Sequence, residues 1–269
     1  MSLKIFQKSK FLYISLLLTF LLTSCDLTSP INNRIVKIQK YITEQNYIKA
    51  TQEYEKILKK NLPPDIEIKI RYQLANIYSI YLGNYRHAKT HLLKIQKITL
   101  DPFWLVKTEE ELGNINLNQL LIYNESAKNY INLVKVRPKL REFDTYQFNL
   151  ALSFYKAKQY QNAIIEFNKL KQNSNHSYYI DAIYYLGKIN FDKQEWNKAI
   201  KLFTIYISKE TNKDSIFNAK YLIANSYESM EMLNEAYKTY YSILRDHPNT
   251  EVIRKRLSSI YNRKVARKR

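Results

Sequence analysis

The stretch WNKAIKLFTIY, residues 196–206, decides how this chain folds. An aromatic residue begins it, and the small residue Ala199 follows three positions later. Large apolar residues then stand at Phe203 and Tyr206. Spacings of three and four place all these side chains on one face of an α-helix. Alanine suits a position where two helices cross closely, because a larger side chain would hold them apart. The stretch therefore predicts a helix packed tightly against a second one.

The same pattern recurs along the chain at intervals of 36 to 39 residues. Its alanines are Ala50, Ala88, Ala127, Ala163, Ala199 and Ala236. In the third copy Ile131 and Val134 follow the alanine, and the aromatic Tyr123 lies one step further out. A period of this length is typical of stacked helical repeats. A non-repetitive helical bundle is the alternative.

A first helix precedes most copies of the pattern and makes each one a hairpin. Its small residues are Ala75, Gly113, Ala151, Gly187 and Ala224, of which Gly113 stands two residues too far from Ala127. Prolines mark the breaks between hairpins, because proline is poorly tolerated inside a helix. The arrangement resembles the tetratricopeptide repeat family, best over Thr145 to Thr250. The resemblance implies an all-α, right-handed α-solenoid of about six helical hairpins over residues 34–250.

The last residues, 251–269, are expected to form a capping helix and a basic tail. Ile253, Leu257, Ile260 and Tyr261 recur on one helical face, which would cover the last hairpin. The tail contributes to a formal net charge of +19. Its candidate contact residues are Arg263, Lys264, Arg267, Lys268 and Arg269. They could meet anionic lipid headgroups or an acidic partner, and a solvated tail of biased composition is the alternative.

The resemblance to tetratricopeptide repeats also implies a binding groove. In that family the fifth, ninth and twelfth positions of each first helix face a concave surface. Here those positions hold Tyr72, Asn76, Phe148, Leu152, Tyr155, Tyr184, Lys188, Phe191, Tyr221 and Asn225. An aromatic row of this kind could hold an extended or helical segment of another protein. The alternative is that the rings pack within long hairpins. The carboxylate clamp of chaperone-binding members is not matched, because the fifth position is aromatic here.

The single cysteine, Cys25, follows a basic segment and then an apolar run over residues 11–22. That run is too short to cross a bilayer, which needs about 20 apolar residues, and it is typical of a secretory signal. The sequence Leu22-Thr23-Ser24-Cys25 resembles the lipobox of bacterial lipoproteins. The resemblance implies that residues 1–24 are removed, that Cys25 is acylated, and that residues 25–33 form a tether. An ordinary signal with an incidental cysteine is the alternative.

No catalytic arrangement stands out, so we do not expect an enzyme, and no cofactor is expected beyond a covalent lipid at Cys25. The three glycines lie far apart and form no phosphate-binding loop. His87 and His91 have the i, i+4 spacing of a metal-binding pair, but Arg86 and Lys89 flank them and no third ligand is evident. No metal site is predicted.

These features together favour a membrane-anchored scaffold or adaptor that binds another envelope protein. The chain resembles the BamD family of outer-membrane assembly lipoproteins in its lipobox, short linker and repeats. Residues 178–250 also resemble the C-terminal domain of the CpoB family, which partners the Tol-Pal system. We expect the chain on the outer membrane, facing the periplasm, with no nucleic-acid partner. The alternatives are a periplasmic cell-division partner or a structural tether to anionic membrane or cell wall.

Overall fold

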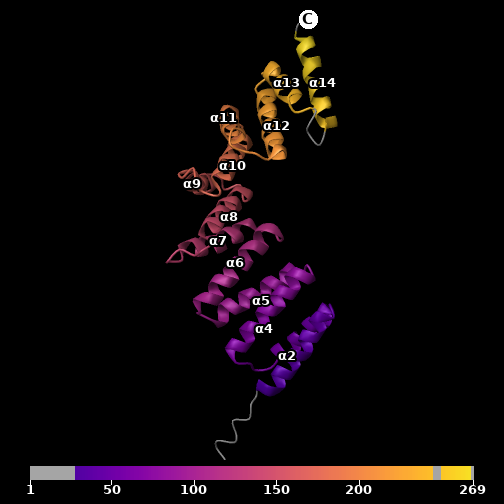
Figure 1. Cartoon of the computed structure of the whole chain (residues 1–269), viewed down its shortest axis with the longest axis vertical. Coiled ribbons are helices and arrows are strands. Elements are labelled where there is room, and N and C mark those ends of the chain that lie inside the picture. The colour runs from indigo at the N-terminus through magenta and orange to yellow at the C-terminus, as the bar shows by residue number, and fades with distance from the viewer. Residues whose placement is uncertain (1–27, 245–249, 268–269) are drawn as a thin grey trace, which may run out of the picture. The chain divides into compact units, whose positions relative to one another are not determined.

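The structure, a computed structural model, describes residues 28–244 and 250–267 (Figure 1). Within those ranges it contains helices and no strand, so the all-α prediction is confirmed. The helices are α2 (Thr28–Thr43), α3 (Tyr47–Leu58), α4 (Pro64–Asn76), the π-helix η1 (Ile77–Tyr81), α5 (Tyr85–Ile98), α6 (Pro102–Asn118), α7 (Tyr123–Lys135), α8 (Phe143–Lys156), α9 (Tyr160–Lys171), α10 (Tyr179–Asp192), α11 (Trp196–Ile207), α12 (Lys213–Ser229), α13 (Leu233–Tyr241) and α14 (Thr250–Ala266). None of these helices is long and apolar enough to cross a membrane.

The chain divides into two compact units, Met1–Leu100 and Asp101–Arg269. In the first unit α2 pairs with α3 (hairpin 1), and α4 with η1 pairs with α5 (hairpin 2). In the second unit the pairs are α6 with α7 (hairpin 3), α8 with α9 (hairpin 4), α10 with α11 (hairpin 5) and α12 with α13 (hairpin 6). The predicted six hairpins are therefore all present.

All six hairpins close with the same turn. Two residues before each second helix, the backbone enters the left-handed region with φ between 56° and 60°. The residues there are Gln45, Gly83, Leu121, Lys158, Gln194 and Glu231. This geometry costs a residue other than glycine about 1 kcal/mol, and only Gly83 escapes that cost. Packing of the paired helices therefore maintains the turn, which explains how a chain with three glycines can make six of them.

Five second helices follow the predicted pattern of an alanine and a large apolar residue four positions later. Both members of each pair are buried: Ala50 and Tyr54, Ala88 and Leu92, Ala163 and Phe167, Ala199 and Phe203, Ala236 and Tyr240. Burying a large side chain of this kind stabilises the fold by about 2–3 kcal/mol relative to leaving it exposed. These pairs form the repeating core of the hairpins.

Hairpin 3 shows that the predicted register was wrong by one residue. The expected positions were Ala127, Ile131 and Val134, whereas the buried residues that take the repeating positions are Ser126, Tyr130 and Leu133. The Ser126 hydroxyl donates to the Gly113 carbonyl at 3.1 Å and shares a hydrogen bond of 2.8 Å with Ser153 Oγ. Serine can replace alanine here because a buried hydroxyl with partners carries no unsatisfied group.

When Ser126 replaces Ala127 as the repeating small residue of α7, its distance from Gly113 in the sequence exceeds the spacing of hairpins 4 to 6 by one residue, not two. The structure takes up that residue at the end of α6, where the Leu120 N–H donates to the Ile115 carbonyl, five residues back, at 2.9 Å. In hairpin 2 the same widening appears as the π-helix η1, and Leu82 N–H bonds to the Ile77 carbonyl at 3.1 Å. A π-type turn absorbs one extra residue without breaking the helix.

Both ends of the described chain pack against hairpins. The predicted capping helix exists as α14, and its Ile253, Leu257 and Ile260 are buried with residues of α13. Tyr261, which we expected on the same apolar face, is 58% exposed.

At the other end α2 begins at Thr28, not at the predicted boundary after residue 33. Helix formation there is favoured because Ile31 is buried in the core of hairpin 1, so residues 28–33 are not an extended tether. The predicted signal peptide and Cys25 lie outside the described residues.

Candidate functional site

The residues predicted to line a groove lie on the first helices of their hairpins. Tyr72, with Asn76, belongs to α4 in the first unit. The other eight belong to the second unit: Phe148, Leu152 and Tyr155 on α8, Tyr184, Lys188 and Phe191 on α10, and Tyr221 and Asn225 on α12. We call these eight residues the aromatic face. All of them are half-buried, which is intermediate between an exposed row of rings and a closed core.

Phe148, on α8, packs against three other rings. It stacks on Tyr178 with centroids 4.5 Å apart and meets Phe167 and Tyr185 edge-on at 6.1 and 5.9 Å. Pairs in these geometries contribute about 0.5–1.5 kcal/mol each beyond their buried area. Phe148 therefore supports the fold as well as lining the face.

Tyr155 lies at the end of α8 and connects hairpins 4 and 5. Its ring meets Tyr185 of α10 edge-on at 5.4 Å. Burial, with the Asp192 carboxylate bonded to the hydroxyl, raises the pKa of the Tyr155 phenol. Tyr160 donates a second hydrogen bond to Asp192, at 3.4 Å. Two phenols thus converge on one carboxylate at the end of α10.

Lys188 is a cation inside this cluster of rings. Its Nζ lies 5.6 Å from the centroid of Tyr155 and 5.9 Å from that of Tyr184. Burial lowers the pKa of Lys188, Lys156 adds to the decrease, and Asp192 opposes it. Tyr184 is held in turn by Tyr206, whose ring centroid is 4.9 Å away. The rings that contact Lys188 are thus themselves held by other rings.

At hairpin 6 the aromatic face meets the capping helix. Tyr221 lies edge-on to Tyr240 at 5.7 Å. The hydroxyl of Tyr240 donates to the side-chain oxygen of Asn225 and also lies 3.2 Å from a carboxylate oxygen of Glu228. The guanidinium of Arg263 on α14 reaches the same Glu228 at 3.0 Å. Asn225 is therefore held in a network that joins α12, α13 and α14. Phe191, the remaining ring of the face, meets Trp196 edge-on at 5.2 Å.

The predicted basic tail is helical as far as the structure describes it. Arg263, Lys264 and Arg267 lie on or directly after α14, while Lys268 and Arg269 lie outside the described residues. Arg263 and Arg267 both bond to Glu231 in the turn between α12 and α13, and Lys264 lies over the ring of Tyr237 at 5.4 Å. Two guanidinium groups of the tail are thus engaged within the chain, which reduces what this segment can offer to an anionic surface.

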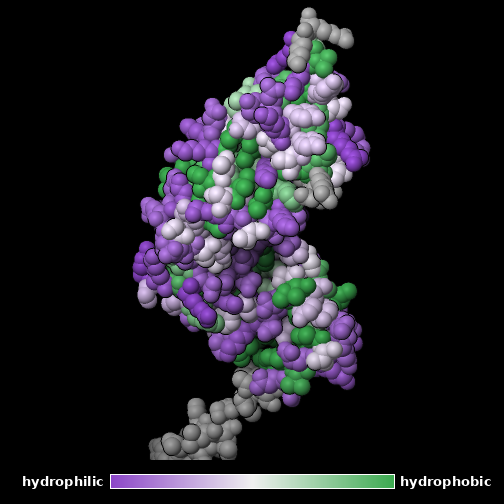
Figure 2. Space-filling model, turned by 45° about the horizontal axis from the view of Figure 1, so that its top comes forward, coloured by the Kyte–Doolittle hydropathy of each residue, from purple (hydrophilic) through white to green (hydrophobic). Residues whose placement is uncertain are grey.

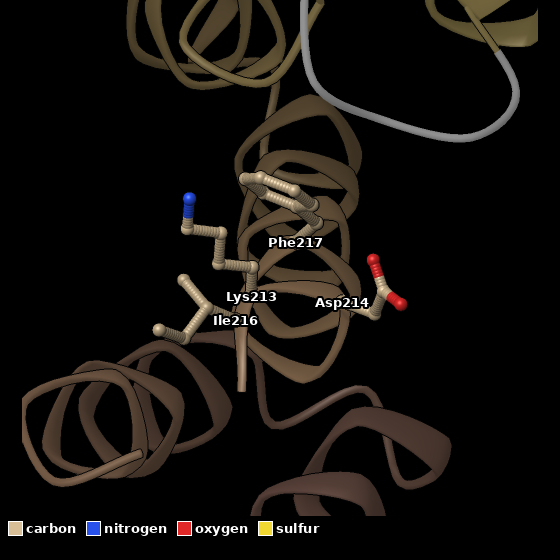
Figure 3. Close-up of a pocket in the computed structure, with 4 residues that line it drawn as sticks. All are labelled: Lys213, Asp214, Ile216 and Phe217. Carbon is tan, nitrogen blue, oxygen red and sulfur yellow. The ribbon is translucent and has the colours of Figure 1, made fainter. Parts of the chain in front are cut away.

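A hollow of about 550 Å³ lies at the start of α12, and no sequence pattern pointed to it. Lys213, Asp214, Ile216 and Phe217 line it (Figure 3). The charged side chains of Lys213 and Asp214 point away from each other, so they do not form one polar centre. Elsewhere in the second unit hydrophobic residues reach the surface among hydrophilic ones, as Figure 2 shows for one face; Ile165 and Tyr241 are examples.

The two histidines with metal-binding spacing lie in different surroundings. His87 is exposed and its Nδ1 lies 2.9 Å from the side-chain oxygen of Asn84. His91 is buried, and its Nε2 lies 3.0 Å from Glu55 Oε1. Within the described ranges, no group of three or more histidine, cysteine or acidic side chains could hold a metal ion.

Comparison with known proteins agrees with the hairpin geometry. Residues 145–175, 181–212 and 218–250 each match the tetratricopeptide repeat family, and they correspond to hairpins 4, 5 and 6. The match covers three segments between residues 145 and 250, which is less than half of the chain. The predicted resemblance is thus confirmed where it was expected to be best, and hairpins 1 to 3 share the same turn. Repeats of this kind present extended surfaces to other proteins, so the chain has the architecture of a protein-interaction scaffold.

Two solved structures show a similar fold. The first is PilW, described as a widely conserved type IV pilus biogenesis factor. It is 16% identical, with a TM-score of 0.53 over 87% of this chain and 99% of PilW. The second is the apo form of RapI, which is 13% identical, with a TM-score of 0.50 over 87% of this chain and 75% of RapI. At these identities the likeness concerns the fold alone. No curated protein sequence matches the chain.

Proposed function

We propose that this protein is a lipid-anchored scaffold that holds a segment of another envelope protein on its aromatic face. The observation that carries the proposal is the recurrence of half-buried aromatic residues on α8, α10 and α12, the first helices of three successive tetratricopeptide repeats. Aromatic side chains thus recur at corresponding positions of successive hairpins. A face built in this way suits a partner segment that runs across several repeats.

Ring contacts within the chain favour binding at this face. Phe148, Tyr155 and Tyr184 each pack against other rings, so their side chains are already ordered before a partner arrives. Ordering a flexible side chain on binding costs about 0.5–1.5 kcal/mol, and much of that cost is absent here. Aromatic side chains are also enriched among the residues that dominate binding energy in protein interfaces.

The membrane anchor in this proposal rests on the sequence before α2. A basic segment, a short apolar run and Leu22-Thr23-Ser24-Cys25 precede the first helix. Each buried CH₂ of an acyl chain at Cys25 would add about 0.8 kcal/mol of membrane affinity. Because α2 begins at Thr28, the first hairpin would lie close to the membrane surface. We place the protein at the outer membrane, facing the periplasm.

Outer-membrane protein assembly is the process that we propose first, on the resemblance to the BamD family. The alternative is a Tol-Pal-like complex of cell division, on the resemblance of residues 178–250 to the CpoB family. A tether that binds membrane or cell wall through the basic tail is less favoured, because Arg263 and Arg267 already pair with Glu231.

Affinity capture from solubilised membranes tests the proposal. We expect the full chain to retain an envelope protein, and Tyr184→Ala to lose most of it. Tyr241→Ala is the matched control, because Tyr241 is an exposed tyrosine on the second helix of its hairpin. Circular dichroism shows whether Tyr184→Ala still folds, and Tyr184→Phe serves if it does not. Equal capture by all variants would contradict the assignment of the aromatic face. The lipid anchor is tested separately by growing cells with a labelled fatty acid. If Cys25 does not take up the label, the proposed anchor is wrong.

A further inference from the structure

The ammonium group of Lys188 is half-buried in the aromatic face and has no carboxylate partner. Within the described part of the chain, no acidic oxygen lies within 4.0 Å of its Nζ, and its contacts are the faces of Tyr155 and Tyr184. An ammonium has three donor hydrogens. Ring faces attract a cation but accept no conventional hydrogen bond. This donor group is therefore still open to an acceptor.

Asp192 is the acid best placed to act on Lys188, and its negative charge raises the pKa of that ammonium, but its carboxylate also accepts hydrogen bonds from phenols. Tyr160 donates to its Oδ2 at 3.4 Å, and the Tyr155 hydroxyl bonds to the same carboxylate. Lys156, exposed at the end of α8, adds a second positive charge nearby. Asp192 keeps its negative charge while it accepts these hydrogen bonds, so the three groups Lys188, Lys156 and Asp192 together carry one positive charge in excess.

We propose that Lys188 is the subsite for an acidic group of the bound segment. Lys188 would donate hydrogen bonds to a carboxylate of the partner. The rings of Tyr155 and Tyr184 would lie on either side of the acidic residue of the partner or of the residue before it. The proposal rests on the proposed function and narrows it, because it selects acidic segments among all possible partners. Hydrogen bonds between a charged donor and a charged acceptor contribute more than neutral ones.

Two sources can supply the carboxylate, an aspartate or glutamate side chain and a free chain terminus. We favour the side chain, since the aromatic face continues from Lys188 to both neighbouring repeats, with Phe148 and Leu152 on α8 and Tyr221 on α12. A segment that crosses all three helices would present a side chain, not its end, at the central one.

A random-peptide display library provides the test, with the full chain in detergent as the target. We expect the selected peptides to be enriched in aspartate and glutamate relative to the library. Lys188→Met keeps most of the side-chain volume, removes the charge, and should abolish that enrichment; Lys188→Arg should keep it. The matched control is Lys201→Met, because Lys201 is exposed on the second helix of the same hairpin.

Synthetic copies of the selected peptides then identify the source of the carboxylate. Replacing the enriched acid by its amide should weaken binding to the wild-type chain at least tenfold and leave binding to Lys188→Met unchanged. Amidation of the peptide C-terminus should have no effect; if amidation alone weakens binding, the terminal carboxylate is the ligand instead.

The possible failures are distinguishable. Peptides that depend on Tyr184 but show no acidic enrichment, or whose enrichment survives in Lys188→Met, would overturn the subsite and leave the aromatic face intact. Selected peptides that bind Tyr184→Ala as tightly as wild type, or a library that yields no binders at all, would overturn the proposed function and the subsite together.

Discussion

Gly187 of α10 lies against the ring of Phe203 of α11 so closely that a Cβ on the glycine would stand 2.8 Å from the ring carbon Cε1. Phe203 is fully buried, so the ring has no free space into which it could move. This contact brings the two helices of hairpin 5 together. It explains why a small residue recurs on the first helices, opposite the large residue of the second.

Gly187→Ala should therefore destabilise the protein. Alanine favours a helix interior over glycine by about 1 kcal/mol, whereas an overpacked core costs about 1–3 kcal/mol. The difference is a loss of about 0–2 kcal/mol, and the close contact with a buried ring favours the upper end, so we expect the free energy of unfolding, measured by urea denaturation, to fall. Ala224→Gly, the reverse change at the equivalent position of α12, is the matched control. A Gly187→Ala protein more stable than wild type would show that the helices can separate without cost.

Ser126 and Ser153 should be energetically coupled. Their hydroxyls lie 2.8 Å apart between α7 and α8, and Ser126 also donates to the Gly113 carbonyl. We expect Ser126→Ala to lower the free energy of unfolding by about 1 kcal/mol, since a typical net hydrogen bond contributes that much. A double-mutant cycle with Ser153→Ala should give a smaller loss than the sum of the two single losses. Strict additivity would mean that the shared bond contributes nothing to stability.

His91 should make the first unit sensitive to acid. Burial lowers the pKa of His91 from its usual 6.5, the charges of Arg71 and Lys94 act in the same direction, and Glu55 opposes them. As the pH falls below about 6.5, the unfolded chain binds a proton that the folded chain refuses, so the free energy of unfolding decreases. The loss continues until the pH passes the folded pKa.

Hydrogen exchange of the α5 amides as a function of pH would measure this effect, after correction for intrinsic exchange rates. We expect protection in α5 to decrease between pH 7 and pH 5, and His91→Gln to remove most of that decrease. His87→Gln, at an exposed position one turn earlier, should leave it unchanged. The same pH dependence in all three proteins would assign it to other groups.

The capping helix should depend on Arg263 more than on its other basic residues. Arg263 pairs with Glu228, whose side chain is 12% exposed, and with Glu231. Arg263→Gln leaves the mostly buried Glu228 with the Tyr240 hydroxyl at 3.2 Å and the longer ion pair with Arg256 at 3.7 Å. We expect a loss of about 1–2 kcal/mol in the free energy of unfolding, because a buried charge has lost a partner.

Lys255→Gln is the control for Arg263→Gln. Lys255 pairs with Glu251 on the surface of the same helix, where both side chains are about three-quarters exposed. Exposed pairs contribute about 0–1 kcal/mol, so this change should have little effect on urea denaturation. Equal effects of the two substitutions would show that the contact with α12 is not what holds α14.

Much of the fold could be predicted from the sequence, because the repeating alanines and the intervening prolines follow directly from helix packing. The third hairpin shows the limit of that reasoning. A pattern based on residue type selects Ala127, whereas the structure selects Ser126, whose hydroxyl finds partners on α6 and α8. Those partners are distant in the sequence, so no local spacing could indicate them.

The sequence predicted which helices carry the residues of the candidate site, but not how deeply their side chains are buried. Its residues were found by their place on the first helices, and the structure puts them there. Their half-burial depends on rings from other helices, such as Tyr178 against Phe148. The pairing of Arg263 with Glu228 likewise joins residues far apart in the chain. Such contacts form only when the hairpins stack, which explains why the basic tail looked free in the sequence.

Site-specific photo-crosslinking in intact cells shows whether the first helices of hairpins 4 to 6 hold another protein. A photoreactive phenylalanine replaces Leu152, on the aromatic face of α8, or Ile165, which is 47% exposed on α9. We predict a discrete adduct with one envelope protein from position 152 and none from position 165. No adduct at position 152, or the same adduct from both positions, would contradict the account.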